Sequence, residues 1–280
     1  MTELVVRRLL IDLQPPFARN WCGADAFSTA FFNALSMSFP FGEQFFIDAV
    51  RDTIATLPPD VQSSRQQEVK GFIGQEATHR RIHALFNAQL EHQGLVDHWT
   101  PRAMARMKLL DGEDPRHALA ITAATEHFTA MFAEWLLAHP EVLAGAEPRL
   151  QTMWLWHSAE ESEHKNTAFD IYRTAGGSEL WRTRWFRRTT LMFLGDLMRQ
   201  TVTNLRHEGE LWKLATWRSA ARILLGRNGL LGSNLKAWHR YFRADFHPSQ
   251  HDSGLAARWL SENPSAFVPV NAPTGSAVAA

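Results

Sequence analysis

Apolar residues recur at intervals of three and four along most of the chain, which predicts a protein built almost entirely of helices. Long helical segments are expected at residues 24–57, 60–93, 114–139, 148–176 and 178–207. Shorter ones are expected at 101–110, 210–225, 232–243 and 253–262, and only residues 4–13 carry a weak strand pattern. Pro40 and Gly42 should interrupt the first segment, because proline removes a helical hydrogen bond.

Four of the long segments carry an apolar stripe of the kind that faces the interior of a helical bundle. We therefore expect one all-α domain over residues 1–263, with a core bundle at about 24–177. Additional C-terminal helices should cover about 178–262. The small, polar residues 264–280 should form a loose tail.

Glutamate and histidine residues continue these apolar stripes at matching positions. Two Glu-x-x-His motifs begin at residues 76 and 161, and this spacing places both side chains of a motif on one helix face. Two further glutamates lie on the stripes of the other two segments, 83 positions apart, while the two motifs are 85 positions apart. The six residues are Glu43, Glu76, His79, Glu126, Glu161 and His164.

An ionised glutamate on a buried stripe costs several kcal/mol unless a cation compensates its charge. Buried salt bridges to Arg80 or Lys165 are one way to compensate it. A metal centre is the other, and four glutamates with two histidines on four stripes favour it. We therefore interpret the six residues as metal ligands that converge inside the bundle.

The arrangement resembles the ferritin-like, carboxylate-bridged dinuclear proteins, in which two helices each supply a glutamate and two supply Glu-x-x-His. More narrowly, four segments resemble the family of predicted metal-dependent hydrolases, over roughly residues 5–260: FPFGEQFF, GFIGQEATHRRIH, TAATEHFTAMFAEW and WLWHSAEESEHKNTAFDIY. The resemblance implies a ferritin-like four-helix bundle that holds two metal ions, with two glutamates bridging them. It implies one ion on Glu43, Glu76 and His79, and the other on Glu126, Glu161 and His164.

Residues next to the six are candidates to orient or extend the centre. In related di-iron enzymes, an acid often precedes the glutamate of the motif and orients a histidine ligand. Glu160 has this place in the second motif, whereas Gln75 has it in the first. His83 and His157 lie one turn from the motifs on the same stripes, as extra ligands, proton shuttles or ordinary buried histidines.

A set of four carboxylates and two imidazoles suits Fe or Mn, and Zn is a further option. Analogy with the ferritin-like proteins favours a di-iron oxidase or oxygenase that uses O2 and an external electron donor. The family description instead implies a hydrolase with a metal-bridging water, and a ferroxidase or iron-binding protein is a third option. No catalytic residue is assigned beyond the metal centre. An apolar, lipid-like substrate is expected against Phe39, Phe46, Phe72, Phe128 and Trp154.

The net charge of zero, from 29 basic and 29 acidic residues, is a cancellation between parts of the chain. Residues 1–177 hold 15 basic and 22 acidic residues, whereas residues 178–243 hold 13 and 4. In this basic part, arginines alternate with tryptophan and phenylalanine. The aromatic residues should pack inward while the arginines pair with the acidic bundle, or the segment contacts an anionic membrane peripherally. No nucleic-acid partner is expected.

The single cysteine, Cys22, excludes a disulfide framework and a thiolate zinc cluster. No stretch approaches 18 uncharged apolar residues, and the N-terminus lacks the apolar core of a signal peptide. We therefore expect a soluble, cytoplasmic protein, with peripheral membrane contact as an option. Metal identity, substrate, electron donor and oligomeric state stay open, a homodimer being one option.

Overall fold

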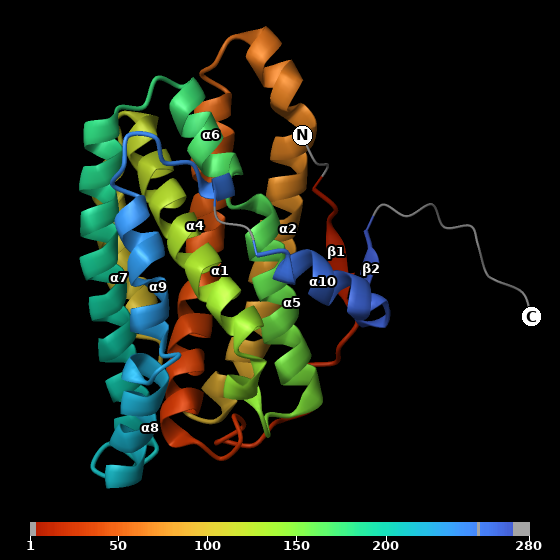
Figure 1. The fold of residues 1–280 in the computed structure, drawn as a ribbon, viewed down its shortest axis with the longest axis vertical. Coiled ribbons are helices and arrows are strands. Elements are labelled where there is room, and N and C mark those ends of the chain that lie inside the picture. The colour runs from red at the N-terminus through yellow and green to blue at the C-terminus, as the bar shows by residue number, and fades with distance from the viewer. Residues whose placement is uncertain (1–3, 251–252, 271–280) are drawn as a thin grey trace, which may run out of the picture.

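The computed structural model describes residues 4–250 and 253–270, and these residues are mostly helical (Figure 1). The α-helices within them are α1 (Ala26–Ile54), α2 (Pro59–His92), α3 (Trp99–Met107), α4 (Pro115–Ala138), α5 (Pro148–His164), α6 (Thr167–Thr174), α7 (Glu179–His207), α8 (Leu214–Leu225), α9 (Leu230–Arg240) and α10 (Leu255–Glu262). Short 3₁₀ turns cover Lys108–Leu110, Pro140–Leu143, Pro248–Gln250 and Pro264–Ala266. The prediction of an all-α fold is confirmed.

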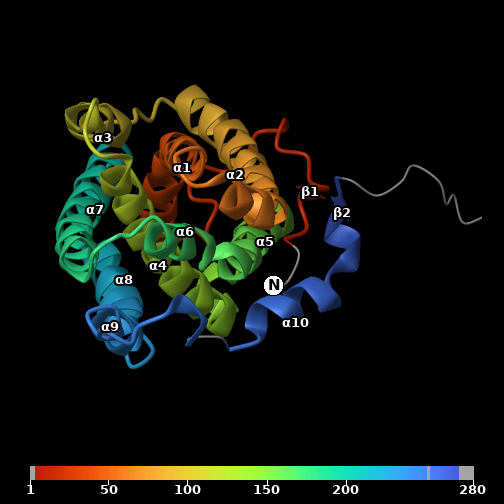
Figure 2. The same ribbon diagram turned by 90° about the horizontal axis from the view of Figure 1, so that it is seen from above.

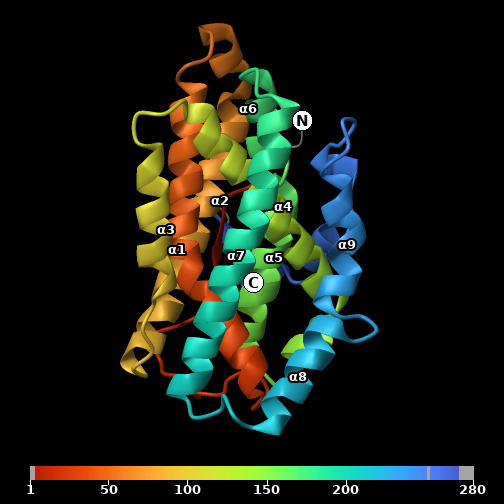
Figure 3. The same cartoon turned by 90° about the vertical axis from the view of Figure 1, so that its left-hand side faces the viewer.

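Helices α1, α2, α4 and α5, which carry the six candidate ligands, pack around a common interior (Figure 2). Helix α7 packs against α1 and α4, and α9 packs against α4. Helices α7, α8 and α9 therefore form a layer on one side of these four, while α10 lies against α5 (Figures 2 and 3). None of the helices in the described residues is both long and apolar enough to cross a membrane.

Local sequence accounts for where several helices begin. The carboxylate of Asp25 accepts the backbone N–H of Ser28 at 2.8 Å and caps α1. Ser178 caps α7 in the same way through the N–H of Trp181. Helices α2, α4 and α5 each begin with a proline, whose missing N–H has no helical partner in the first turn anyway.

Helix α1 continues through Pro40, so the expected interruption at Pro40 and Gly42 was wrong. Proline has no N–H to donate to the carbonyl of Ser36, four residues earlier. That carbonyl instead accepts the side-chain amide of Asn87, on α2, at 2.9 Å. The neighbouring helix thus satisfies the backbone group that the proline leaves free.

The segment expected at 148–176 is divided into α5 and α6 directly after His164. Lys165, in the break, lies 3.8 Å from Glu134 of α4. At the C-terminal end, residues 264–269 are not a loose tail but a turn followed by strand β2 (Phe267–Pro269). This strand pairs antiparallel with β1 (Arg7–Leu9), within the weak strand pattern of residues 4–13. Residues 271–280 of the expected tail lie outside the described residues.

Candidate metal centre

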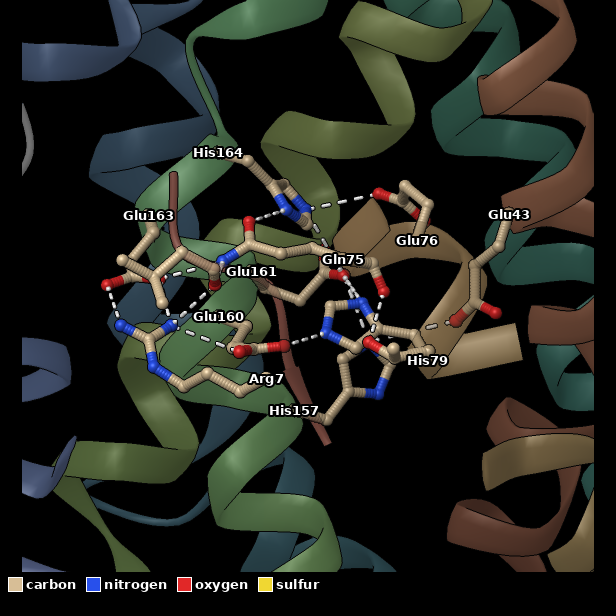
Figure 4. A network of polar contacts seen from close by, with 12 residues as sticks. Arg7, Glu43, Gln75, Glu76, His79, His157, Glu160, Glu161, Glu163 and His164 are labelled. Carbon is tan, nitrogen blue, oxygen red and sulfur yellow. Dashed lines mark hydrogen bonds and ion pairs between the residues drawn. The ribbon is translucent and has the colours of Figure 1, made fainter. Parts of the chain in front are cut away.

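The six predicted ligands come together in the interior that α1, α2, α4 and α5 share (Figure 4). All are buried, with Glu161 the most exposed at 5%. Donor atoms of Glu76, His79, Glu161 and His164 lie within 4.8 Å of one another. The other two are Glu126, with Oε2 3.4 Å from His164 Nε2, and Glu43, with Oε1 3.8 Å from His157 Nε2.

Many donor atoms of this cluster are buried and have no hydrogen-bond partner within the described residues. They are both carboxylate oxygens of Glu43, Glu76 and Glu126, together with Glu161 Oε2, His79 Nδ1 and His164 Nε2. Leaving one such group unpaired costs about 1–3 kcal/mol, and more when it is charged. Carboxylate oxygens and imidazole nitrogens are also common metal ligands. The residues present therefore fit a metal centre.

Glu160 determines which nitrogen of His79 faces the cluster. Its Oε1 accepts a hydrogen bond from Arg7 at 3.0 Å, and its Oε2 lies 2.9 Å from His79 Nε2. Because the carboxylate is the acceptor, Nε2 of His79 carries the proton. The Nδ1 atom is left with a lone pair, 3.3 Å from Glu161 Oε1.

Gln75 does the same for His164. Its amide nitrogen donates to the carbonyl of Val5 at 3.0 Å and to Glu163 at 2.9 Å, and this fixes the direction of the amide. The amide oxygen lies 3.0 Å from His164 Nδ1 and accepts a hydrogen bond from it. His164 Nε2 therefore faces the glutamates, 3.2 Å from Glu76 Oε1. The residue that precedes each motif glutamate thus orients the histidine of the other motif (Figure 4).

Burial and mutual repulsion decide the charges of the four glutamates when no metal is bound. Burial raises the pKa of Glu43 and Glu76 well above the ordinary range, and that of Glu126 to about 8.

The pKa of Glu161 is instead held low, because His164, His157 and His79 outweigh its burial. Glu126 and Glu161 in turn raise the pKa of His164 against the effect of burial. A metal ion would have to displace protons from the side chains whose pKa is raised.

Imidazoles lie against the candidate glutamates, which does not favour the interpretation of buried salt bridges to Arg80 or Lys165. Arg80 is exposed, and it donates a hydrogen bond to Gln44. Lys165 Nζ lies 3.8 Å from Oε1 of Glu134. The remaining partners of the cluster are His83 and His157: His157 Nε2 lies 2.9 Å from Glu161 Oε1, and its Nδ1 lies 2.7 Å from His83 Nε2.

An apolar cavity of about 320 Å³ reaches the cluster from one side. It lies among α1, α4, α5, α7 and α9, and the ionisable residues in its wall are His157 and Glu161. Three of the aromatic residues expected to face a substrate, Phe39, Phe128 and Trp154, line this cavity.

The other two aromatic residues lie elsewhere. Phe46 lines a separate, smaller cavity of about 100 Å³. Phe72 packs edge-on against the His164 ring, with ring centroids 5.2 Å apart, and is not part of the wall of the larger cavity.

Comparison with known proteins agrees with the donor set. The model of one family, described as predicted metal-dependent hydrolases, matches residues 5–252. The chain belongs to this family. No curated protein and no solved structure matches it. Membership supports a metal-dependent hydrolase more than the oxidase or oxygenase that the ligand pattern suggested.

In this family member, the closest donor atoms cross between the two ligand sets that the resemblance implied. Glu76 and His79 group with Glu161 and His164. Glu43 instead groups with His83 and His157, whose nitrogens also face the cluster. The division of the residues between two ions stays a prediction.

Sequence reasoning missed two residues that hold the candidate metal centre together. Arg7, on β1, donates to both Glu160 and Glu163, the latter at 2.6 Å. Glu163 follows Glu160 by three positions and so lies on the same face of α5, which is a signal that a search for orienting groups could use. Arg7 is distant in sequence from both glutamates and carries no local signal.

Proposed function

We propose that the chain is a metal-dependent hydrolase that cleaves an ester-type bond in an apolar, lipid-like molecule at a dinuclear centre. One observation carries the proposal: a buried cluster of unpaired carboxylate and imidazole donor atoms adjoins an apolar cavity. Family membership supports the reaction type. The apolar wall of the cavity supports the substrate class.

The ligands in this proposal are the six residues that the sequence singled out. When bound, two metal ions would polarise the scissile carbonyl and activate a water molecule for attack. Glu160 and Gln75 hold His79 and His164 with their lone pairs toward the metal side, so the protein is organised in advance for binding. Fe or Mn suits this oxygen-rich set, and Zn remains an option.

The cavity determines what can approach the centre. Its volume of about 320 Å³ is within the range of small-molecule sites, about 300–1,000 Å³. Glu161 and His157 lie in its wall among phenylalanine, leucine and tryptophan side chains. A hydrocarbon chain would therefore pack along the aromatic wall, excluding water, while its polar end lies at Glu161.

A di-iron oxidase or oxygenase is the second candidate, and one observation favours it. The donor set is rich in carboxylates, which iron accepts readily, and the apolar cavity would shield a reactive oxidant from water. This reaction would need O2 and an external electron donor, whereas hydrolysis needs neither. A ferroxidase would need no organic substrate, so the cavity would have no role in it.

The candidates separate in one set of assays. Protein loaded with Mn(II), Fe(II) or Zn(II) is tested on nitrophenyl esters of short and long fatty acids, with and without O2, beside a Glu76→Gln variant. We expect hydrolysis that is independent of O2, prefers long chains and is lost in the variant. Turnover that requires O2 and a reductant would support the oxidase instead, and Fe(II) oxidation without any organic product would support the ferroxidase.

A further inference from the structure

The proton positions on His83 can be derived from its neighbours on α1 and α2. The amide nitrogen of Asn87 donates to the carbonyl of Ser36, so the amide oxygen faces the Ser36 hydroxyl, 2.7 Å away, and accepts from it. Since the only hydrogen of this hydroxyl is donated in the hydrogen bond to Asn87, the Ser36 oxygen must accept a hydrogen bond from His83 Nδ1, which lies 2.8 Å away. His83 is therefore protonated on Nδ1.

The same argument extends to His157. A neutral His83 ring that carries its proton on Nδ1 can only accept a hydrogen bond at Nε2. That atom lies 2.7 Å from His157 Nδ1, which therefore donates. A neutral His157 ring that donates through Nδ1 has a lone pair on Nε2. This lone pair lies 2.9 Å from Glu161 Oε1 and 3.8 Å from Glu43 Oε1.

This lone pair lies beside two glutamate side chains in a buried group of donor atoms close enough to share a cation, since donor atoms of Glu43, His83 and His157 lie within 4.8 Å of one another. We propose that His157 is a further metal ligand, through Nε2, at the same ion as Glu43 and Glu161. His83 is then a positioning residue: it holds the His157 ring through Nδ1, as Glu160 holds His79. The inference rests on the proposed dinuclear centre and adds a third imidazole to its ligands.

Equilibrium dialysis against Mn(II) or Co(II), followed by metal analysis, tests this assignment. The wild-type protein should bind two ions. In His157→Ala, affinity for one ion should fall by more than about 100-fold, because losing a ligand exceeds the roughly 10–100-fold cost of losing an orienting partner. Added imidazole should restore that ion, since residue 157 lines the cavity. In the matched variant His83→Ala, affinity should fall less, and added imidazole should not restore it.

The outcomes that overturn the assignment differ from those that overturn the proposed function. Two ions bound with unchanged affinity in His157→Ala would remove His157 from the ligand set and leave the dinuclear centre standing. Equal losses in the two variants, with no rescue by imidazole, would also remove it. Wild-type protein that binds no metal would overturn both. Visible absorption of the Co(II) protein should change in His157→Ala and return with imidazole, and an unchanged spectrum would contradict ligation.

A second inference concerns the surface formed by α7, α8 and α9, and it rests on different observations. Part of the aromatic set of this layer packs inward as expected, with Phe186 buried and Trp185 and Trp238 against it, whereas Trp212 and Trp217 are exposed. Arg222 pairs with Asp25 at the start of α1, but most of the basic residues of this layer do not pair with the acidic bundle. The following basic residues are exposed and form no ion pair with a carboxylate of residues 4–250 or 253–270: Arg184, Arg187, Arg188, Arg199, Arg206, Arg218, Arg227, Lys236 and Arg240.

Exposed apolar side chains lie among these charges. Leu231 and Leu235, on α9, are 45% and 55% exposed and also line the 320 Å³ cavity, so they mark its mouth. Leu191, on α7, is 75% exposed, and Trp212, just before α8, is 90% exposed. Figure 3 shows α7 and α9 on one side of the molecule, joined by α8. Basic residues interspersed with exposed leucine and tryptophan are typical of surfaces that bind anionic lipid.

We infer that the layer of α7, α8 and α9 docks on an anionic lipid bilayer, with the cavity mouth at Leu231 and Leu235 facing the acyl chains. The unpaired positive charges supply complementarity to anionic headgroups, and the exposed leucines and tryptophan supply apolar area. A lipid chain can then enter the cavity directly from the bilayer. This inference deepens the proposed function by naming the source of its lipid-like substrate.

Sedimentation with vesicles tests the docking without any assay of activity. The full chain should bind phosphatidylglycerol-containing vesicles at low salt, and bind pure phosphatidylcholine vesicles weakly. Arg199→Gln/Lys236→Gln should weaken binding about 25-fold, since each basic residue near an anionic surface contributes about 1 kcal/mol. The matched pair Arg8→Gln/Arg81→Gln, also exposed but on β1 and α2, should bind like wild type.

Three results would overturn the docking. They are no binding to anionic vesicles at low salt, equal weakening by the two variant pairs, and tighter binding to a DNA duplex than to anionic vesicles. Leu231→Ser/Leu235→Ser should reduce the binding that persists at high salt, and unchanged binding would contradict contact at the cavity mouth. Glu76→Gln should bind vesicles normally. A failure of the metal hypothesis therefore remains distinguishable from a failure of the docking.

Discussion

The side-chain oxygen of Gln75 on α2 accepts a hydrogen bond from Nδ1 of His164 on α5 at 3.0 Å. Glu160 makes the reciprocal contact from α5 to His79 on α2. The two Glu-x-x-His motifs therefore support each other, because the residue before each glutamate orients the other motif's histidine. An amide at one of these places orients the ring without adding a second buried negative charge.

Removing the Gln75 amide should weaken metal binding. In Gln75→Leu, His164 loses its acceptor and can rotate, so affinity should fall about 10–100-fold, as for other orienting partners. Competition with a chromophoric chelator measures this change. The control is Gln66→Leu, an exposed residue of the same helix, whose affinity should match wild type. Equal affinities of the two variants would show that Gln75 does not position His164.

Arg7 should contribute strongly to stability through β1. It is 8% exposed and pairs with Glu160 and Glu163, so Arg7→Ala leaves the buried Glu160 and the partly buried Glu163 without their cationic partner. We expect a loss of about 3–5 kcal/mol in the free energy of unfolding, measured in denaturant. The neighbouring residue Arg8 is exposed on the same strand, and Arg8→Ala should change stability by no more than about 0.5 kcal/mol. Similar losses in the free energy of unfolding for both variants would contradict a stabilising role for the ion pairs of Arg7.

The stability of the metal-free protein should fall as pH rises from 4.5 to about 8. In the folded state, burial raises the pKa of Glu126 from 4.5 to about 8, so the folded protein retains a proton that the unfolded chain releases. By linkage, folding is then disfavoured progressively across this window, and the effect levels off above it. Glu43 and Glu76 shift in the same direction and add to it.

Glu126→Gln removes the Glu126 contribution to this pH dependence. At pH 8 and in a chelator, the variant should melt at a higher temperature than wild type, with a gain of no more than about 5 kcal/mol. Below pH 4.5 the two proteins should be closely similar, because Glu126 is protonated in both states. Added metal should stabilise wild type more than the variant, because the variant has lost one ligand. A variant less stable than wild type at pH 8 would contradict the buried, protonated Glu126.

Filling the cavity should reduce binding of long apolar molecules without affecting the metal. Ala133 is buried and lines the 320 Å³ cavity, so Ala133→Phe places a ring in that space. We expect weaker binding of a fluorescent long-chain fatty acid and unchanged metal content. Ala84→Phe, at an exposed position of α2, is the size-matched control and should bind the probe normally. Normal probe binding by Ala133→Phe would place the apolar ligand elsewhere.

The helical class and the set of residues that meet in the interior could be predicted from the amino-acid pattern alone. Steps of three and four place residues on one face of a helix regardless of what packs against it, so Glu76 and His79 could be assigned to an inward stripe. A charged residue on such a stripe needs compensation, and this physical requirement selected the candidate ligands without any coordinates.

Which atoms face one another could not be predicted, because it depends on how the helices and strands pack together. The contacts of Arg7 with Glu160, and of Asn87 with the carbonyl that Pro40 leaves free, join residues on different elements. Periodicity describes a single helix, whereas these contacts depend on the relative positions of two elements. For the same reason, the sequence could not tell which of His157 and His83 is the proposed metal ligand and which is the positioning residue. The distinction depends on a chain of hydrogen bonds that joins Asn87, Ser36, His83 and His157. This chain exists only once α1, α2 and α5 have packed together.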